Sequence, residues 1–302
     1  MYPNGDVRVE GVALPSEGVE LVGDLYRPAT QPTTDASPAV VVVGSWTTVK
    51  EQMAGRYAAG LARRGLTALA FDFRGYGASK GDPQNFESPE RKIADIVSAV
   101  AYLASRPDVD ASRIGALGIC AGSGYVAVAA SRTPRIRSVA MVAPWLHDRT
   151  LVPDIYGGPE GVRERIAQGE AARDKYETTG EVDYIPAASG TDAQAAMYGP
   201  FDYYLNADRG AVPQWRNQFA VMSWPQWLTF DPIAVAPRLT APTFMLHSPD
   251  AAIPDGARRF HDSLTAPKEL QWTTGNQFDF YDQEPTVTAA LDSVGAHFGR
   301  TL

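Results

Sequence analysis

Short apolar runs alternate with stretches of helical apolar spacing along most of the 302-residue chain, and this alternation limits the possible folds. The run AVVVVGS at 39–45 is rich in β-branched residues, as expected of a strand that is buried on both faces. Residues 88–105 follow the helical period, with Ser88 as N-cap and Pro89 at the first helical position. Strands that alternate with helices predict a mostly parallel, doubly wound sheet covered by helices on both faces.

The other expected elements continue this alternation to the end of the chain. The predicted strands are 7–14, 19–26, 66–73, 113–119, 136–144, 242–248 and 268–274. The predicted helices are 49–64, 121–130, 254–265 and 285–299.

One stretch, residues 146–230, interrupts the alternation with several helical segments. It also holds a cluster of large aromatic residues: Tyr156, Tyr198, Phe201, Tyr203, Tyr204, Trp215, Phe219, Trp224 and Trp227. An insertion between two strands of a parallel sheet lies at the edge where ligands bind in such folds. We therefore predict a core formed by residues 1–145 and 231–302, with a helical cap formed by residues 146–230. The aromatic residues either line a substrate cavity or form the cap's own core.

The composition excludes several classes of partner. A net charge of −8 argues against nucleic acid or an anionic membrane surface. No apolar run approaches the roughly 20 residues of a membrane helix. A single cysteine excludes an internal disulfide, and the N-terminal sequence is not expected to be a secretory signal. We predict a cytoplasmic protein that binds a small molecule, with no cofactor and no metal, and leave open whether it forms a homodimer.

The only cysteine, Cys120, lies in the sequence GICAGSG at 118–124. Residues 118–122 match the G-x-S-x-G motif with cysteine in place of serine, between a predicted strand and a predicted helix. In this motif the nucleophile lies on a strained turn, and side chains at the two flanking glycine positions would clash. The turn also places the thiol at a helix N-terminus, which stabilises a thiolate. Cys120 is therefore the candidate nucleophile.

This motif, FDFRGYGAS at 71–79, the helix start VKE at 49–51 and DAAIP at 250–254 together resemble the α/β-hydrolase family. Within the family, the chain is similar to the dienelactone-hydrolase-like branch, some members of which have a G-x-C-x-G elbow. The resemblance implies the α/β-hydrolase fold from about Val19 to the C-terminus. It also implies Asp250 as the catalytic acid, with a loop aspartate or a helix cap as the alternative.

The resemblance also implies a histidine after the last strand, and none occurs in GNQFDFY at 275–281. Gln277 stands near the expected place, and glutamine accepts no proton at neutral pH. Ordinary ester hydrolysis needs a base for the nucleophile and again for water. Among the four histidines, His147 follows the strand at 136–144 and should emerge in the same crevice as Cys120. We consider it either a relocated base or proton donor, or a structural hinge of the cap.

The remaining site residues follow from the expected position of the substrate carbonyl. The resemblance implies an oxyanion hole formed by the backbone N–H of Ala121 and one N–H from the loop after residue 43, for which we choose Trp46. The candidate substrate-binding residues lie in the cap or beside the site: Trp145, Tyr156, Trp224, Trp227, Gln277 and Phe278.

Three functions are compatible with these residues. The first is hydrolysis or acyl transfer on an ester, thioester or lactone through Cys120, on a bulky apolar or secondary-metabolite substrate. The second is a lyase, elimination, isomerisation or cyclase reaction, in which His147, Asp250 or Asp279 would move protons. The third is a non-catalytic binding protein, although decay of a site would not be expected to preserve both the elbow and the acid motif.

Overall fold

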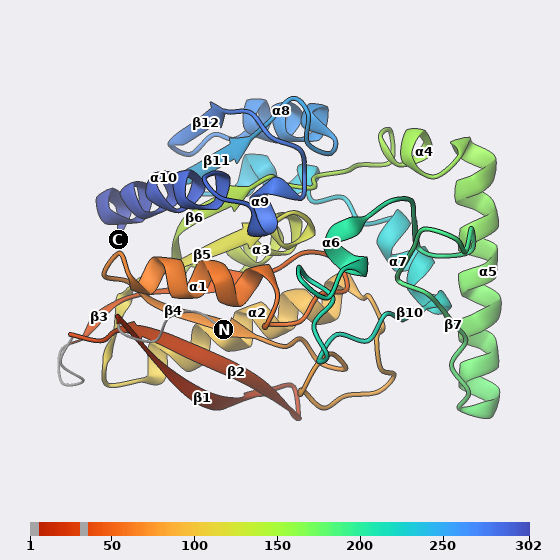
Figure 1. The fold of residues 1–302 in the computed structure, drawn as a ribbon, viewed down its shortest axis with the longest axis horizontal. Coiled ribbons are helices and arrows are strands. Elements are labelled where there is room, and N and C mark those ends of the chain that lie inside the picture. The colour runs from red at the N-terminus through yellow and green to blue at the C-terminus, as the bar shows by residue number, and fades with distance from the viewer. Residues whose placement is uncertain (1–5, 31–35) are drawn as a thin grey trace.

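The computed structural model describes residues 6–30 and 36–302, and an eight-stranded sheet runs through its centre (Figure 1). The strand order is β1-β2-β4-β3-β5-β6-β11-β12, in which β1 and β2 join one edge antiparallel and all other neighbours are parallel. The strands are β1 (Val7–Ser16), β2 (Val19–Pro28), β3 (Ser37–Val43), β4 (Thr67–Phe71), β5 (Val109–Ile119), β6 (Ile136–Val142), β11 (Thr243–His247) and β12 (Lys268–Trp272). This architecture confirms the predicted α/β class.

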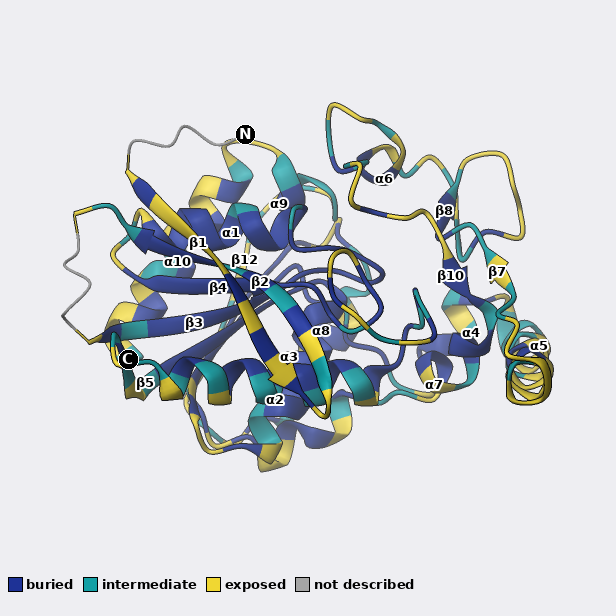
Figure 2. Ribbon diagram, turned by 90° about the horizontal axis from the view of Figure 1, so that it is seen from below, coloured by how far each residue is buried: buried dark blue, intermediate teal, exposed yellow. Residues whose placement is uncertain are grey.

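Helices cover both faces of the sheet, which explains why the central strands contain so few polar residues. Every residue of β4 and β11 is buried, whereas β1 and β12 at the two edges carry exposed residues (Figure 2). The covering helices are α1 (Met53–Ala62), α2 (Pro89–Ser105), α3 (Ala121–Arg132), α8 (Pro254–Ser263), α9 (Asp279–Asp282) and α10 (Thr286–Thr301).

The N-terminal ends of two predicted helices differ in how well the local sequence defines them. Ser88 caps α2 as predicted, because its Oγ accepts the backbone N–H of Arg91 at 3.3 Å. The predicted helix 49–64 begins only at Met53. The backbone N–H groups of Val49 and Lys50 donate instead to the side chains of Gln52 and Asp72, so these residues form a turn.

The insertion between β6 and β11 contains small elements and one long helix, α5, which stands at the right-hand edge of Figure 1. Its helices are α4 (Val152–Ile155), α5 (Gly158–Thr179), α6 (Asp202–Leu205) and α7 (Trp224–Leu228), with 3-10 helices η1 (Val221–Ser223) and η2 (Ile233–Arg238). Its short strands are β7 (Tyr184–Ile185), β8 (Ala188–Ser189), β9 (Met197–Tyr198) and β10 (Phe219–Ala220). Several of its aromatic residues belong to the same hydrophobic cluster as the sheet.

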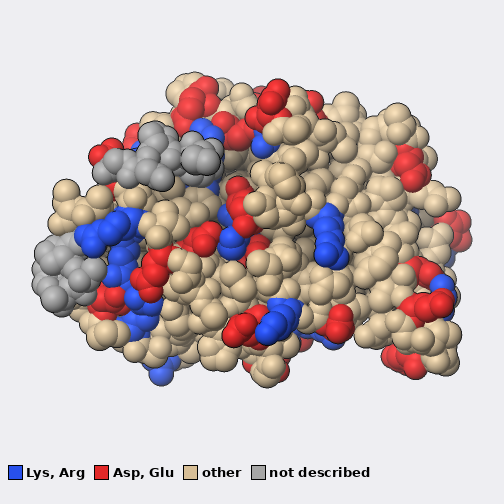
Figure 3. All heavy atoms as spheres, turned by 60° about the horizontal axis from the view of Figure 1, so that its bottom comes forward, with Lys and Arg blue, Asp and Glu red and all other residues tan. Residues whose placement is uncertain are grey.

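The surface carries charges of both signs. On the face shown in Figure 3, lysine and arginine side chains lie among aspartate and glutamate side chains. Among the described residues, no helix combines the length and the apolar character that crossing a membrane requires.

Candidate active site

Cys120 lies on the tight turn between β5 and α3, with φ 54° and ψ −122°. A left-handed φ is uncommon for a residue with a side chain and marks local strain. The flanking glycines are sterically required: a Cβ at Gly118 would lie 2.4 Å from the Cα of Ser123. A Cβ at Gly122 would lie 2.4 Å from the carbonyl oxygen of Gly44. The chain therefore holds the Cys120 side chain at the end of the sheet where α3 begins.

Hydrogen-bond donors surround the sulfur of Cys120, which is 5% exposed. Burial raises the pKa of the thiol, and hydrogen bonds from Ser45, Tyr281, the Ala121 N–H and Gln277 oppose this rise. No histidine is among these groups. The thiol is therefore neutral at pH 7 in the closed site, and several donors would stabilise the thiolate once it forms.

The hydroxyl groups near Cys120 form a connected network. Tyr204 donates to Ser45 Oγ at 3.0 Å, and Ser45 Oγ lies 3.3 Å from the hydroxyl of Tyr281. Burial raises the pKa of Tyr281 well above its usual value, so its hydroxyl stays protonated. No motif in the sequence brings Ser45, Tyr204 and Tyr281 together, because their proximity depends on three distant segments of the chain.

Gln277 is held at both ends of its amide. Its Nε2 donates to the carbonyl of Ala143 at 2.9 Å and to the hydroxyl of Tyr281 at 3.2 Å, and its Oε1 accepts the Ala252 N–H at 3.0 Å. Gln277 therefore links the end of β6, the loop after β11 and the network around the thiol.

Asp250 lies on the same loop as Ala252 but is exposed. It lines a cleft of about 630 Å³ together with Gln277 and Phe278. Within the described part of the chain, Gln277 contacts this loop through the Ala252 N–H, and no hydrogen bond joins its amide to the Asp250 carboxylate. The three residues thus lie at one opening beside Cys120, without the linkage of a catalytic triad.

His147 is buried between the core and the cap. Its Nδ1 accepts the indole N–H of Trp145 at 2.9 Å, and its Nε2 donates to the carbonyl of Trp227 at 3.1 Å. Burial lowers its pKa to about 4. Because both ring nitrogens are engaged and neither contacts Cys120, the geometry favours the hinge interpretation of His147 over the catalytic one.

The loop after β3 carries the second expected oxyanion donor. Among the described residues, the backbone N–H of Trp46 donates to no acceptor, and the Ala121 N–H is one of the first N–H groups of α3, which have no intrahelical partner. The Trp46 N–H is thus free for a substrate oxygen, whereas the Ala121 N–H hydrogen-bonds the Cys120 sulfur and would have to turn to such an oxygen. The neighbouring residue Thr47 has φ 61°, so the loop adopts a conformation that needs support from outside.

Glu87 supplies this support. Its buried carboxylate accepts the backbone N–H of Thr47 at 2.9 Å and the hydroxyls of Tyr76 and Tyr125 at 2.9 and 2.6 Å. Lys92, also buried, pairs with it at 2.7 Å. Hydrogen bonds and an ion pair thus satisfy the Glu87 carboxylate. Through the Thr47 N–H it holds the loop at residues 44–48, which we call the oxyanion loop. No motif in the sequence singles out Glu87.

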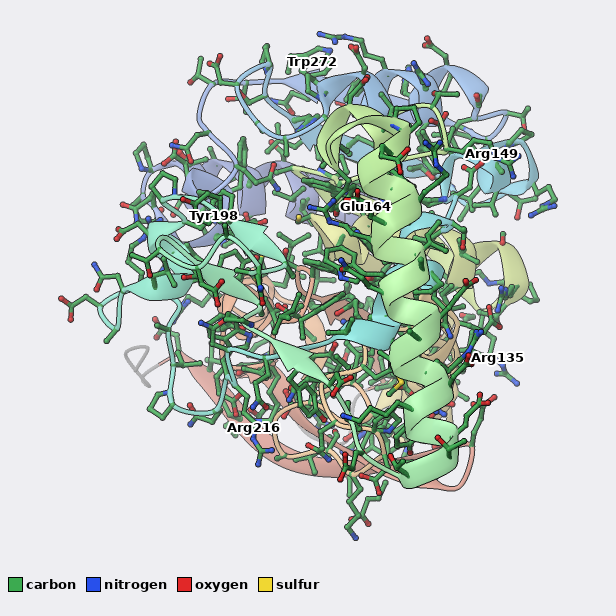
Figure 4. The ribbon with its side chains drawn as sticks, turned by 90° about the vertical axis from the view of Figure 1, so that its right-hand side faces the viewer. Arg135, Arg149, Glu164, Tyr198, Arg216 and Trp272 are labelled. Carbon is green, nitrogen blue, oxygen red and sulfur yellow. The ribbon has the colours of Figure 1, made fainter. Side chains whose placement is uncertain are left out.

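The predicted substrate-binding aromatic residues of the cap pack onto this loop. The rings of Trp227 and Trp224 lie 5.0 and 6.0 Å from that of Trp46, and Trp227 donates its indole N–H to the hydroxyl of Tyr156 at 2.6 Å. Trp224 also lines a cavity of about 340 Å³ with Glu164 on α5, the helix in front in Figure 4. Trp224 and Trp227 thus cover the loop that carries Trp46.

A family model described as X-Pro dipeptidyl-peptidase (S15 family) matches residues 17–270. The uncharacterized protein PA2218 of Pseudomonas aeruginosa is 29% identical over 310 residues, covering 94% of this chain and 78% of that protein. The polyketide transferase claH of Penicillium crustosum is 26% identical, covering 86% of each chain. The thiohydrolase aneE of Aspergillus aculeatus is 25% identical, covering 85% of this chain and 81% of that protein.

Solved structures show the same fold. The crystal structure of PA2218 superimposes with a TM-score of 0.87 at 25% identity, covering 100% of this chain and 96% of that one. The α/β hydrolase GrgF from Penicillium sp. sh18 superimposes with a TM-score of 0.81 at 21% identity, covering 97% of this chain and 99% of that one. The predicted α/β-hydrolase fold is therefore confirmed.

Proposed function

Because this chain belongs to the X-Pro dipeptidyl-peptidase (S15) family of α/β-hydrolase-fold enzymes, we propose that it is an acyltransferase whose acyl group passes through Cys120. The observation that supports this proposal is the set of hydrogen-bond donors around the Cys120 sulfur, with no histidine among them. Such a site favours formation of an acyl-enzyme and disfavours its hydrolysis.

A thioester is the acyl donor that suits this site. In acylation, the sulfur of Cys120 bonds to the carbonyl carbon, and the bond from this carbon to the leaving thiol breaks. The proton of Cys120 passes through the hydroxyls of Tyr281 and Ser45 to the leaving thiolate. A thiol leaving group has a pKa of about 8.5, so it departs without a strong general acid, whereas an alkoxide would need one.

The oxyanion that forms during this step would be bound by the backbone N–H groups of Ala121 and Trp46. Hydrogen bonds to the developing charge in a water-excluded site lower the barrier most effectively. Glu87 contributes indirectly, since it holds the loop that carries Trp46.

The second half of the reaction needs an acceptor better than water. Gln277 cannot activate water, so we propose transfer to a more reactive nucleophile or cyclisation within the acyl group. The aromatic side chains that cover the oxyanion loop suit a bulky apolar acyl group. The names of the relatives, a polyketide transferase and a thiohydrolase, agree with acyl-thioester chemistry on such groups.

An intact-mass time course with the hexanoyl thioester of N-acetylcysteamine tests this proposal. We expect a hexanoyl adduct that persists in buffer, is discharged by an added thiol or amine, and is absent in Cys120→Ala. Gln277→His should clear the adduct about 10²-fold faster, because a base then activates water. Absence of any wild-type adduct would overturn the proposal, and rapid clearance by water alone would make the protein a hydrolase.

A non-hydrolytic reaction is the second candidate, and one observation favours it. Burial raises the pKa of Cys120, so the neutral thiol could donate a proton to an enolate bound in the oxyanion hole. Such an enzyme would form product without an acyl adduct.

A further inference from the structure

Two unpaired polar side-chain atoms lie on consecutive residues of the oxyanion loop. Among the described residues, five buried side-chain nitrogen or oxygen atoms lack a hydrogen-bond partner, and these include Trp46 Nε1 and Thr47 Oγ1. Trp46 is 5% exposed and Thr47 is 1% exposed. An unpaired buried donor costs about 1–3 kcal/mol, so native proteins retain few of them.

Three other indole N–H groups of this aromatic region are paired. The indole N–H of Trp227 donates to Tyr156, that of Trp215 to the carbonyl of Thr47, and that of Trp145 to His147. The surroundings of Trp46 are aromatic rings: Phe219 at 4.8 Å, Trp227 at 5.0 Å and Trp224 at 6.0 Å. The indole N–H of Trp46 is therefore a buried donor that has no acceptor among the described residues, although it lies close to three indole N–H groups that have one.

The position of Trp46 indicates what this donor can bind. Ser45, the preceding residue, hydrogen-bonds the Cys120 sulfur, and the backbone N–H of Trp46, which has no acceptor among the described residues, is the expected oxyanion donor. The indole N–H belongs to the same residue, so the atom it binds lies within a few bonds of the reacting carbonyl. An indole N–H only donates, which requires an acceptor oxygen and excludes an ammonium group.

We infer that Trp46 Nε1 binds a second oxygen of the acyl group, a keto or hydroxyl oxygen within a few carbons of the thioester carbonyl. The inference rests on the proposed function and adds a substrate class to it: acyl thioesters oxygenated near the carbonyl. The hydroxyl of Thr47, the next residue, is a second unpaired polar group on the same loop. The side chain of Trp46 therefore selects among acyl groups, whereas its backbone N–H binds the carbonyl oxygen of every acyl group.

Acylation rates of two substrates in three proteins test this inference. The substrates are the β-ketohexanoyl and hexanoyl thioesters of N-acetylcysteamine, and quenched intact-mass measurements follow the adduct on Cys120. Trp46→Phe should slow acylation by the β-keto substrate about 10- to 10²-fold, as expected for one buried hydrogen bond, and slow the hexanoyl substrate less than about 3-fold. Trp215→Phe is the matched control, because its paired N–H contacts the same loop; both substrates should slow equally.

The outcomes separate this inference from the function on which it rests. If Trp46→Phe slows acylation by both substrates equally, Trp46 acts only in packing and the inference is overturned. The proposed function would stand in that case, because the wild-type protein is still acylated. If neither substrate acylates the wild-type protein, both the inference and the proposed function are overturned. If Trp46→Phe does not fold, benzothienylalanine at position 46 keeps the ring shape and removes only the N–H, and the same selectivity loss is expected.

Discussion

At the scale of single residues, the proton of Cys120 is the central problem, since no histidine in the described part of the chain acts on the sulfur. The hydroxyl of Tyr281 is the best-placed substitute, because it reaches the sulfur and also Ser45 and Gln277. It stays protonated, as burial raises its pKa well above the usual value. Tyr281 therefore stabilises the thiolate as a donor and relays its proton, and it does not act as a base.

Tyr281→Phe should slow acylation of Cys120 by about 10-fold or more, because the thiolate loses a hydrogen bond from a buried donor. The thiol pKa should rise in this variant, which moves the pH–rate profile of acylation to higher pH. Quenched intact-mass measurements of the acylation rate from pH 6 to about 10 detect both effects. Tyr57→Phe is the control: that hydroxyl is also buried but donates to the carbonyl of Phe280 at 2.7 Å. An unchanged profile in Tyr281→Phe would remove the hydroxyl from the mechanism.

At the scale of elements, the segment around α6 closes the site. Tyr204 on α6 reaches Ser45, Gly210 accepts a hydrogen bond from Gln52, and Arg209 pairs at 2.6 Å with Asp282, the last residue of α9. These contacts hold the segment over the loop that carries Ser45. A substrate must therefore displace it or enter through the cleft beside Gln277.

Arg209→Ala should let the α6 segment open more often. Loss of a partly buried ion pair worth about 1 kcal/mol raises the open population about 5-fold. Limited proteolysis should then cut between residues 199 and 218 correspondingly faster, with the rest of the chain intact. Arg300→Ala, which removes an exposed pair with Glu269, should leave the cleavage rate unchanged. Equal rates in all three proteins would mean that Arg209 does not hold the segment closed.

The elements also show how far sequence reasoning extends. The strand β3 and the helix α2 follow from local patterns, a β-branched run and a proline after a serine cap, so their positions were predictable. The predicted start of α1 was wrong because Asp72, which follows another strand, accepts a hydrogen bond from the Lys50 N–H. The short strand β7 pairs with β10 across the cap, and no local pattern encodes such a contact.

The residues of the candidate site likewise fall into those that the sequence could predict and those that it could not. Cys120 and Gln277 could be chosen because motifs fix their places, whereas Ser45 and Glu87 act through contacts between distant segments. His147 was placed near the correct edge of the sheet, but its engagement by Trp145 and Trp227 required the packed cap. The assignment to the dienelactone-hydrolase-like branch stays a prediction.

At the scale of the whole molecule, three buried histidines make stability depend on pH. Burial lowers the pKa of His147, His247 and His297 to about 4 in each case. The unfolded chain takes up protons near pH 6.5, while the folded chain does so only near pH 4. The unfolded state therefore binds more protons between these values, and stability is lost as the pH falls through this window.

The free energy of unfolding should thus decrease from pH 7 to about 4.5, by at most roughly 3 kcal/mol for each histidine. Urea unfolding followed by fluorescence at several pH values measures the slope. His147→Gln keeps a donor and an acceptor for Trp227 and Trp145 but cannot be protonated, so its slope should be smaller. The variant should still acylate Cys120 at about the wild-type rate; a large loss of acylation would restore His147 to the reaction.

The buried Glu87 has a consequence for how this architecture can change over evolution or in the laboratory. Its four donors come from the oxyanion loop, the turn after β4, the start of α2 and the middle of α3. Transferring the loop together with Glu87 into a relative would leave a buried carboxylate unpaired unless Tyr76, Lys92 and Tyr125 were transferred as well. The loop that is closest to the chemistry is thus the least modular part of the molecule, and new specificities are more accessible through the cap.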